Sequence, residues 1–218
     1  MKDTIKKILK RLTSRSNIGT DLPSFRRINL KKVSPFSVRM VDNFELGPGD
    51  SPYQLYAFLS TLFDDKIILD IGSQCGNSAL SLSYNESNHV RSYEIDSGHP
   101  DIEYCQHTIH RDNITWKDYD FREDENRDGE CQIDYNKVAI ILIDIDPHGW
   151  KGKDGKEEEL KMIEFLLEKG WTGVIILDDI YKGCQMQDFW NALSIPGWTK
   201  IDVSELGHSS GTGILFPS

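Results

Sequence analysis

Five acidic side chains stand where predicted strands end, a pattern typical of a ligand-binding edge. They are Asp70, Glu94, Asp144, Asp178 and Asp179. In an open α/β sheet, ligands bind beyond the carboxyl ends of the strands, so these acids are expected to line one cleft. Carboxylates that converge in one place repel one another unless a cation neutralises them. The ligand is therefore expected to carry positive charge, or to be accompanied by a divalent metal.

The first of these acids opens a turn that contains two glycines. In the stretch KIILDIGSQCGNSAL, an apolar run ends at Asp70, and Gly72 and Gly76 follow before a predicted helix. Glycine permits a tight turn and a close approach of backbone to a ligand, while free N–H groups at the helix start can bind it. The dinucleotide fingerprint requires glycine where Gln74 and Asn77 stand, which argues against an NAD-dependent enzyme.

The order of acid and glycines, Asp-x-Gly-x-x-x-Gly, resembles the first motif of the class I methyltransferases, which use S-adenosylmethionine. In that family the acid and the glycine-rich backbone hold the amino acid end of the cofactor. The resemblance implies the following cofactor contacts in this chain: Asp70, Gly72, Ser73, Gly76 and Ser78. A glycine-bearing turn that holds no ligand is the alternative interpretation.

Two further acids extend the predicted cofactor site. Glu94 lies near the end of a predicted strand over residues 89–96, one helix and one strand after the glycine turn. Its carboxylate can accept hydrogen bonds from both ribose hydroxyls of an adenosine. Asp96 is the alternative, but it also suits the cap of the next turn. Members of the resembled family place adenine contacts just past the third strand, predicted over residues 113–118, which implies Asp118.

The acids after the fourth and fifth predicted strands make the resemblance more specific. Asp144 follows the apolar run 138–143, and Asp178 and Asp179 follow the run 171–177. This spacing is similar to that of the metal-dependent O-methyltransferases, which include catechol-type enzymes and enzymes that methylate sugar hydroxyls. The resemblance implies a divalent metal, Mg²⁺ or else Mn²⁺, held by the oxygen ligands Asp144, Asp178 and Asp179.

This segment also departs from the pattern of the resembled enzymes. Pro147 is inserted after the first metal acid, so Asp146 is an alternative to Asp144 as the ligand. Asp178 replaces the glutamate often found at its position. His148 stands near the place where the sugar enzymes carry a histidine base. Helix capping and loop solvation are the alternative roles for all of these acids.

The expected chemistry is transfer of a methyl group to a hydroxyl oxygen. An alcohol must lose its proton as it attacks the methyl carbon, with help from a base, from metal coordination, or from both. Asp144 and His148 are therefore the predicted catalytic residues, and His208, in the polar loop 207–213, is the predicted substrate contact. Because an aliphatic alcohol is harder to deprotonate than a catechol, the histidine favours a sugar or glycan acceptor. The alternatives are a catechol-like or other small molecule, or a cofactor-binding module without transfer.

The elements that must position these residues predict one α/β domain, and the length of 218 residues fits it. Predicted strands and helices alternate as far as the fifth strand, and two more strands follow over residues 198–203 and 213–216. The resemblance implies a Rossmann-like methyltransferase fold, with a mostly parallel seven-stranded sheet, an antiparallel C-terminal hairpin and helices on both faces. The domain is assigned to residues 45–218, after a basic N-terminal helix and an irregular lead-in over residues 1–44.

The charge of the chain is unevenly distributed. The net charge is −10, although the first 32 residues hold ten Lys or Arg against two acids. The remaining acidic body repels phosphates, so a nucleic acid partner is not expected, although the basic arm is the part of the chain that could still bind one. The basic helix has one apolar stripe, and it suits an anionic membrane surface, a glycosyltransferase partner or its own domain.

Cysteine usage and hydropathy indicate the compartment. Four cysteines lie far apart without a C-x-x-C pair, which argues against structural zinc and favours reduced thiols. No apolar run approaches the roughly 20 residues that span a bilayer, and the segment after Met1 lacks the apolar centre of a secretory signal. A cytoplasmic location is therefore expected.

Overall fold

The computed structural model describes residues 25–33, 44–95, 111–121, 133–145 and 155–218. The predicted basic N-terminal helix lies outside these ranges. None of the helices within the described ranges is both long and apolar enough to cross a membrane.

The centre of the fold is a seven-stranded sheet in the order β3-β2-β1-β4-β5-β7-β6. Its first five strands are parallel, and β7 runs antiparallel to both β5 and β6. The predicted methyltransferase-type sheet with a C-terminal antiparallel hairpin is thus confirmed. The strand bounds are β1 Ile67–Ile71, β2 His89–Glu94, β3 Ile114–Asp118, β4 Val138–Ile143, β5 Val174–Asp178, β6 Trp198–Asp202 and β7 Thr212–Pro217.

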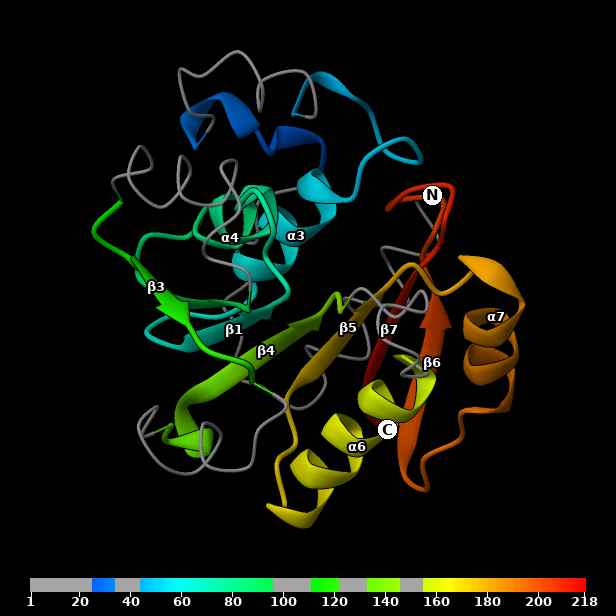
Figure 1. Ribbon diagram of the computed structural model, residues 1–218. Coiled ribbons are helices and arrows are strands. Elements are labelled where there is room, and N and C mark those ends of the chain that lie inside the picture. Colours follow the sequence, from blue (N-terminus) through cyan, green and yellow to red (C-terminus); the bar gives the residue numbers. More distant parts are fainter. Residues whose placement is uncertain (1–24, 34–43, 96–110, 122–132, 146–154) are drawn as a thin grey trace.

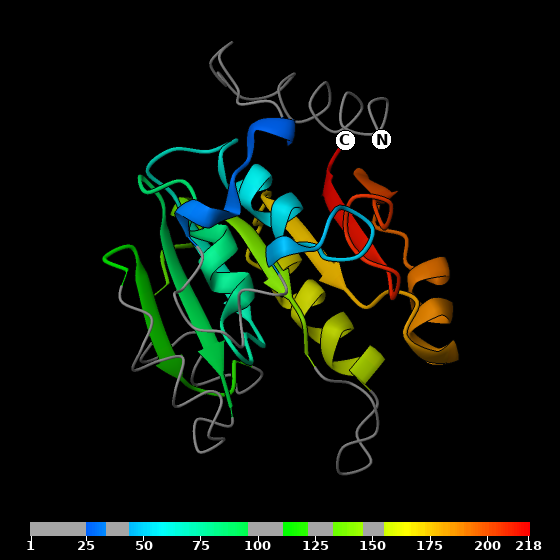
Figure 2. The same ribbon diagram turned by 90° about the horizontal axis from the view of Figure 1, so that it is seen from above.

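Helices cover both faces of the sheet, as Figure 1 shows. One face carries α3 (Tyr53–Ser60) and α4 (Asn77–Leu82), together with the 3-10 turns η1 (Phe25–Arg27) and η2 (Leu30–Lys32). The other face carries α6 (Gly155–Glu168) and α7 (Gly183–Ala192). A further 3-10 turn, η4 (Tyr135–Lys137), leads into β4. The view from above in Figure 2 shows the sheet between these two layers.

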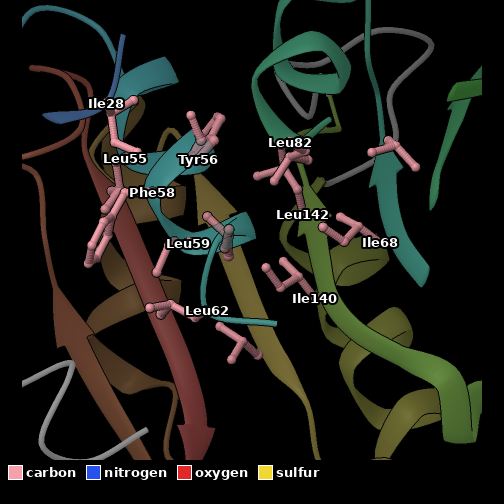
Figure 3. Packing of buried hydrophobic residues seen from close by; sticks show 14 of the residues in the cluster. Ile28, Leu55, Tyr56, Phe58, Leu59, Leu62, Ile68, Leu82, Ile140 and Leu142 are labelled. Carbon is pink, nitrogen blue, oxygen red and sulfur yellow. The ribbon is translucent and has the colours of Figure 1, made fainter. Parts of the chain in front are cut away.

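Alternate residues of each central strand supply the two cores. Ile140 and Leu142 of β4 pack with the cluster under α3 and α4, whereas Ile141 and Ile143 pack with the cluster under α6 and α7. Side chains of a strand alternate between faces, so a strand covered on both sides reads as an unbroken apolar run. Figure 3 shows Ile140 and Leu142 beside Leu82 of α4.

The end of α6 follows directly from its sequence. Gly170 adopts a left-handed conformation with φ of 67°, which glycine tolerates without strain. Its N–H donates to the Leu167 carbonyl at 2.9 Å, and the Trp171 N–H donates to the Leu166 carbonyl at 3.0 Å. This pair of bonds is a Schellman cap, and it returns the chain toward β5.

The glycine turn after β1 packs directly against the end of β4. Gly72 has a φ of 86°, and a Cβ atom placed there would lie 1.8 Å from the carbonyl oxygen of Asp144. The Asp144 N–H donates to the Ile71 carbonyl at 2.9 Å, which holds the two strand ends together. The protein's own backbone therefore requires a glycine at position 72, whether or not a ligand approaches it.

Gly72→Ala is expected to lower the free energy of unfolding by more than about 3 kcal/mol, since the left-handed conformation alone costs roughly 1–2 kcal/mol and the Asp144 backbone must also move. Gly170→Ala is the matched control, because Gly170 is also left-handed but a Cβ there meets nothing within 4 Å. Urea denaturation of both ligand-free variants measures the difference. If both variants lost the same free energy of unfolding, the ends of β1 and β4 would be shown to move apart at no cost in stability.

Candidate functional site

Asp70 is fully buried at the end of β1, with 0% exposure. Its Oδ2 atom accepts hydrogen bonds from the hydroxyls of Ser78, at 3.1 Å, and Ser92, at 3.0 Å. Its Oδ1 atom has no hydrogen-bond partner among the residues that the structure describes. Burial raises the pKa of Asp70 to about 7, although the two serine hydroxyls oppose the shift. A cation beside Oδ1 would restore the ionised form.

The predicted ribose acceptor, Glu94, holds the glycine turn in place. Its Oε2 atom accepts the N–H of Gln74 at 2.7 Å, and its Oε1 atom accepts the N–H of Ile95 at 2.8 Å. Each carboxylate oxygen has a second lone pair, so both remain able to accept a ribose hydroxyl. The Glu94 carboxylate thus shapes the turn and still presents acceptors at the end of β2.

The other residues predicted to contact the cofactor surround this turn. Gly76 is left-handed, with φ of 78°, and directly precedes α4. Ser73 is buried beneath the turn, where its carbonyl accepts the Gly76 N–H at 2.7 Å. The Ser78 hydroxyl is directed to Asp70, so its role is to orient that carboxylate. Asp118 is exposed at the end of β3, in register with Glu94.

Asn77, at the start of α4, provides a second buried acceptor without a partner. Its Oδ1 atom makes no hydrogen bond among the described residues, while its Nδ2 atom donates to the Tyr53 hydroxyl at 3.5 Å. Burial raises the pKa of Tyr53 to about 12, so the phenol stays neutral. Unpartnered acceptors on Asp70 and Asn77 fit a ligand that brings N–H donors and positive charge, as the amino acid end of S-adenosylmethionine does.

The acids at the ends of β4 and β5 act on one another electrostatically, as their positions at one sheet edge predict. Burial and the charges of Asp178, Asp179 and Asp70 raise the pKa of Asp144 well above its usual range. We refer to these four residues as the acidic cluster. Their mutual repulsion has to be relieved by protonation, by a ligand cation, or by positive side chains of the protein.

Glu159 on α6 adds a fifth acid that sequence reasoning missed. It is 1% exposed, and within the described ranges its Oε2 atom has no hydrogen-bond partner. Burial, together with the charges of Asp179 and Asp178, raises the pKa of Glu159 well above its usual range. The sequence did indicate that this side chain is buried. Apolar residues follow Glu159 at the helical spacings of three, four and seven positions, namely Met162, Ile163 and Leu166, so Glu159 lies on the same face of the helix.

His208 reaches the acidic cluster from the loop between β6 and β7. Its Nε2 atom lies 2.7 Å from Asp178 Oδ1 and 4.0 Å from Asp179 Oδ1. Burial alone would lower the pKa of His208, but the hydrogen bond and charge of Asp178 outweigh it and hold the pKa above its ordinary value. The sequence-based expectation was a substrate contact, whereas the observed partner of His208 is Asp178.

Lys182 supplies a positive charge, with its Nζ atom 2.8 Å from Asp179 Oδ2. Burial alone would raise the pKa of Asp179, but hydrogen bonds, chiefly from Lys182, hold it below its usual range. Lys182 and His208 therefore occupy the two carboxylates that were expected to coordinate a metal. Sequence reasoning identified neither of these two ion pairs.

The arrangement does not fit the predicted metal site of Asp144, Asp178 and Asp179. Within the described ranges, no three His, Cys, Asp or Glu side chains form a group suited to a metal ion. The alternative ligand Asp146 and the predicted base His148 lie outside the described residues. Binding of Mg²⁺ or Mn²⁺ therefore stays a prediction from the sequence.

Comparison with solved structures identifies the fold. One similar structure is a candidate caffeoyl-CoA O-methyltransferase from Staphylococcus aureus, with a TM-score of 0.55 and 16% identity over 99% of this chain and 100% of that one. Another is an SAH-bound methyltransferase from Podospora anserina, with a TM-score of 0.52 and 13% identity over 99% of this chain and 96% of that one. A candidate rRNA methylase from Clostridium thermocellum is also similar, with a TM-score of 0.52 and 15% identity over 79% of this chain and 100% of that one. Neither a family model nor a curated protein sequence matches the chain.

The chain thus has the Rossmann-like fold of the class I methyltransferases. At these identities the likeness shows the fold alone, and it spans structures whose names indicate different acceptors. Function has to be argued from the residues of the site.

Asp70→Asn is expected to stabilise the ligand-free protein at pH 8. The pKa of Asp70 is raised from 3.8 to about 7 in the folded state, so the native state keeps a proton that the unfolded chain loses, and stability falls as pH rises through this window. The asparagine removes this loss, which is about 3 kcal/mol between pH 5 and pH 8. Urea denaturation at pH 5 and pH 8 measures it, with the exposed Asp118→Asn as control. If the free energy of unfolding of Asp70→Asn fell between pH 5 and pH 8 as much as that of the wild type, the raised pKa of Asp70 would be contradicted.

Proposed function

We propose that the protein transfers a methyl group from S-adenosylmethionine to a hydroxyl oxygen, with a sugar or glycan as the acceptor. The observation that carries this proposal is the unpartnered Oδ1 atom of Asp70, fully buried beside the glycine turn of a class I methyltransferase fold. A buried acceptor without a partner is costly in the free protein, so it points to a ligand that donates to it.

The cofactor supplies an electrophilic methyl group on a positively charged sulfur. In the proposal, Asp70 and Asn77 accept hydrogen bonds from its ammonium group, and Glu94 accepts from the ribose while its bonds to Gln74 and Ile95 fix the carboxylate. Asp118 stays the predicted adenine contact. The charge of the acidic cluster favours a cationic cofactor over nicotinamide dinucleotides, whose phosphates are negative.

The acceptor side is assigned to the end of β5 and the loop before β7. There Asp178 and His208 lie beside Ser210, whose hydroxyl is 2.5 Å from the imidazole. A hydroxyl nucleophile needs a group that takes its proton, and an aliphatic alcohol needs it more than a catechol does. This need supports a sugar or glycan over a catechol-like molecule, which is the alternative acceptor.

Other expectations from the sequence remain proposals. A membrane surface or glycosyltransferase partner for the basic N-terminal helix, and a cytoplasmic location, rest on charge and composition alone. The acidic body argues against nucleic acid as the acceptor. A module that binds the cofactor without transferring its methyl group is the alternative function.

The cofactor assignment predicts that Glu94→Ala lowers the affinity for S-adenosylmethionine by roughly 10- to 100-fold. This is the loss expected when charge-assisted hydrogen bonds are removed and the turn is loosened. Glu86→Ala is the matched control, because that exposed carboxylate pairs with Arg111 instead. Isothermal calorimetry with S-adenosylmethionine measures both, and NADH serves as the ligand that should not bind. Wild-type affinity in Glu94→Ala would show that the ribose lies elsewhere.

An acceptor screen with labelled S-adenosylmethionine tests the transfer itself. Methyl glycosides, small glycans, catechol and capped RNA are compared at equal concentration, and label in a glycoside or glycan is the expected outcome. Cofactor binding without transfer to any acceptor would favour the binding module. Faster transfer to catechol than to any sugar would reassign the acceptor class.

A further inference from the structure

The His208 side chain is held at both ring nitrogens. Asp178 Oδ1 lies 2.7 Å from Nε2, and Ser210 Oγ lies 2.5 Å from Nδ1. When Asp178 is ionised and the ring is neutral, Nε2 carries the proton and Nδ1 is the acceptor for the Ser210 hydroxyl, which also hydrogen-bonds Asp179. The three side chains form a directed chain of hydrogen bonds that runs from Ser210 through His208 to Asp178.

The backbone around this chain is fixed by the neighbouring loops. The Tyr181 N–H donates to the Ser210 carbonyl at 2.7 Å, and the Gly49 N–H donates to the Gly207 carbonyl at 2.9 Å. His208 itself pairs with Gly49 in an isolated β-bridge. Because these side chains are already held in place, little further ordering is needed for them to reach a reactive geometry.

Asp178 is anchored at the inner end of the chain. Its Oδ1 atom also accepts the hydroxyl of Thr212 at 3.2 Å, and the two residues are in register across β5 and β7. Ser210, at the outer end, is only partly buried, whereas Thr212 is fully buried. Among the described residues, the Ser210 end of this chain of hydrogen bonds is therefore more open to an acceptor than the Thr212 end.

We propose that Ser210, His208 and Asp178 form a proton relay that deprotonates the acceptor hydroxyl, an inference that rests on the proposed methyl transfer. The acceptor O–H gives its proton to Ser210 Oγ as the Ser210 proton passes to His208 Nδ1. The acceptor oxygen forms a bond to the methyl carbon while the carbon–sulfur bond breaks, which leaves a neutral thioether. The imidazolium is stabilised by Asp178 and later returns its proton to water.

The relay gives the acids at the end of β5 a role that differs from metal coordination. Asp178 orients the imidazole and balances its charge, and Lys182 neutralises Asp179. In this assignment Ser210 is the catalytic residue that touches the acceptor, His208 carries the proton, and Asp178 is a positioning residue. The relay needs no divalent ion.

The test compares kcat for two acceptors of different acidity, a methyl glycoside and catechol. General-base assistance is worth roughly 10²- to 10⁴-fold, and it matters most for an alcohol whose pKa is close to the ~15.7 of water rather than the ~10 of a phenol. His208→Gln is expected to lower kcat at least ~100-fold with the glycoside and less than ~10-fold with catechol. A purely structural loss would lower both rates equally.

Ser210 is tested by a matched series in the same loop. Ser210→Ala is expected to lower kcat with the glycoside at least ~10-fold, whereas Ser210→Thr keeps the hydroxyl and restores most of the rate. Ser209→Ala is the control, because that neighbouring side chain is exposed and contributes nothing to the relay. Calorimetry with S-adenosylmethionine confirms that each variant is folded and binds the cofactor.

The outcomes separate the relay from the proposed function. Wild-type rates in Ser210→Ala and His208→Gln would overturn the relay while leaving methyl transfer intact. Loss of wild-type activity in EDTA, restored by Mg²⁺, would also overturn it and return Asp178 and Asp179 to the metal. No transfer by the wild type to either acceptor, with cofactor binding intact, would overturn both proposals.

Discussion

Negative charge crowded at the carboxyl edge of the sheet is the constraint on which the arrangement of the site depends. Carboxylates that lie together in a poorly solvated place raise one another's pKa and destabilise the fold unless they are compensated. The chain relieves this repulsion in several ways. Serine hydroxyls bond Asp70, the imidazole of His208 bonds Asp178, and the positive charge of Lys182 pairs with Asp179. Within the part of the chain that the structure describes, Asp70 Oδ1 and Glu159 Oε2 still have no hydrogen-bond partner, and the pKa of Asp144 stays raised, so a cationic ligand would gain most at these three acids.

Much of the fold could be predicted because its signals are local. The run 138–143 is apolar at every position, and all of its residues are buried in β4. The glycine at position 170 ends α6 by a cap whose two hydrogen bonds both lie within residues 166–171. The convergence of the acids could also be predicted, since parallel strands place their carboxyl ends at one edge. These inferences need the order of the elements but no detail of their packing.

The partners of the acids could not be predicted, because they depend on register and on contacts distant in sequence. Asp70 meets Ser92 only because β1 and β2 pair with these two residues side by side. His208 meets Asp178 because β7 is inserted between β5 and β6. The packing of Gly72 could likewise not be predicted, since the nearest obstacle to a side chain there is the backbone of Asp144, far along the chain. Glu159 is different, because its place on an apolar stripe was visible in the sequence.

The strand order also divides the site between two parts of the gene. The glycine turn, Asp70 and Glu94 come from the first half of the sequence, while β5, β7 and the loop that carries His208 come from the last quarter. The two parts share a sheet but contribute different sides of it. If the proposed assignment holds, substitutions in the last quarter of the sequence can alter which acceptor is bound without touching the residues that hold the cofactor.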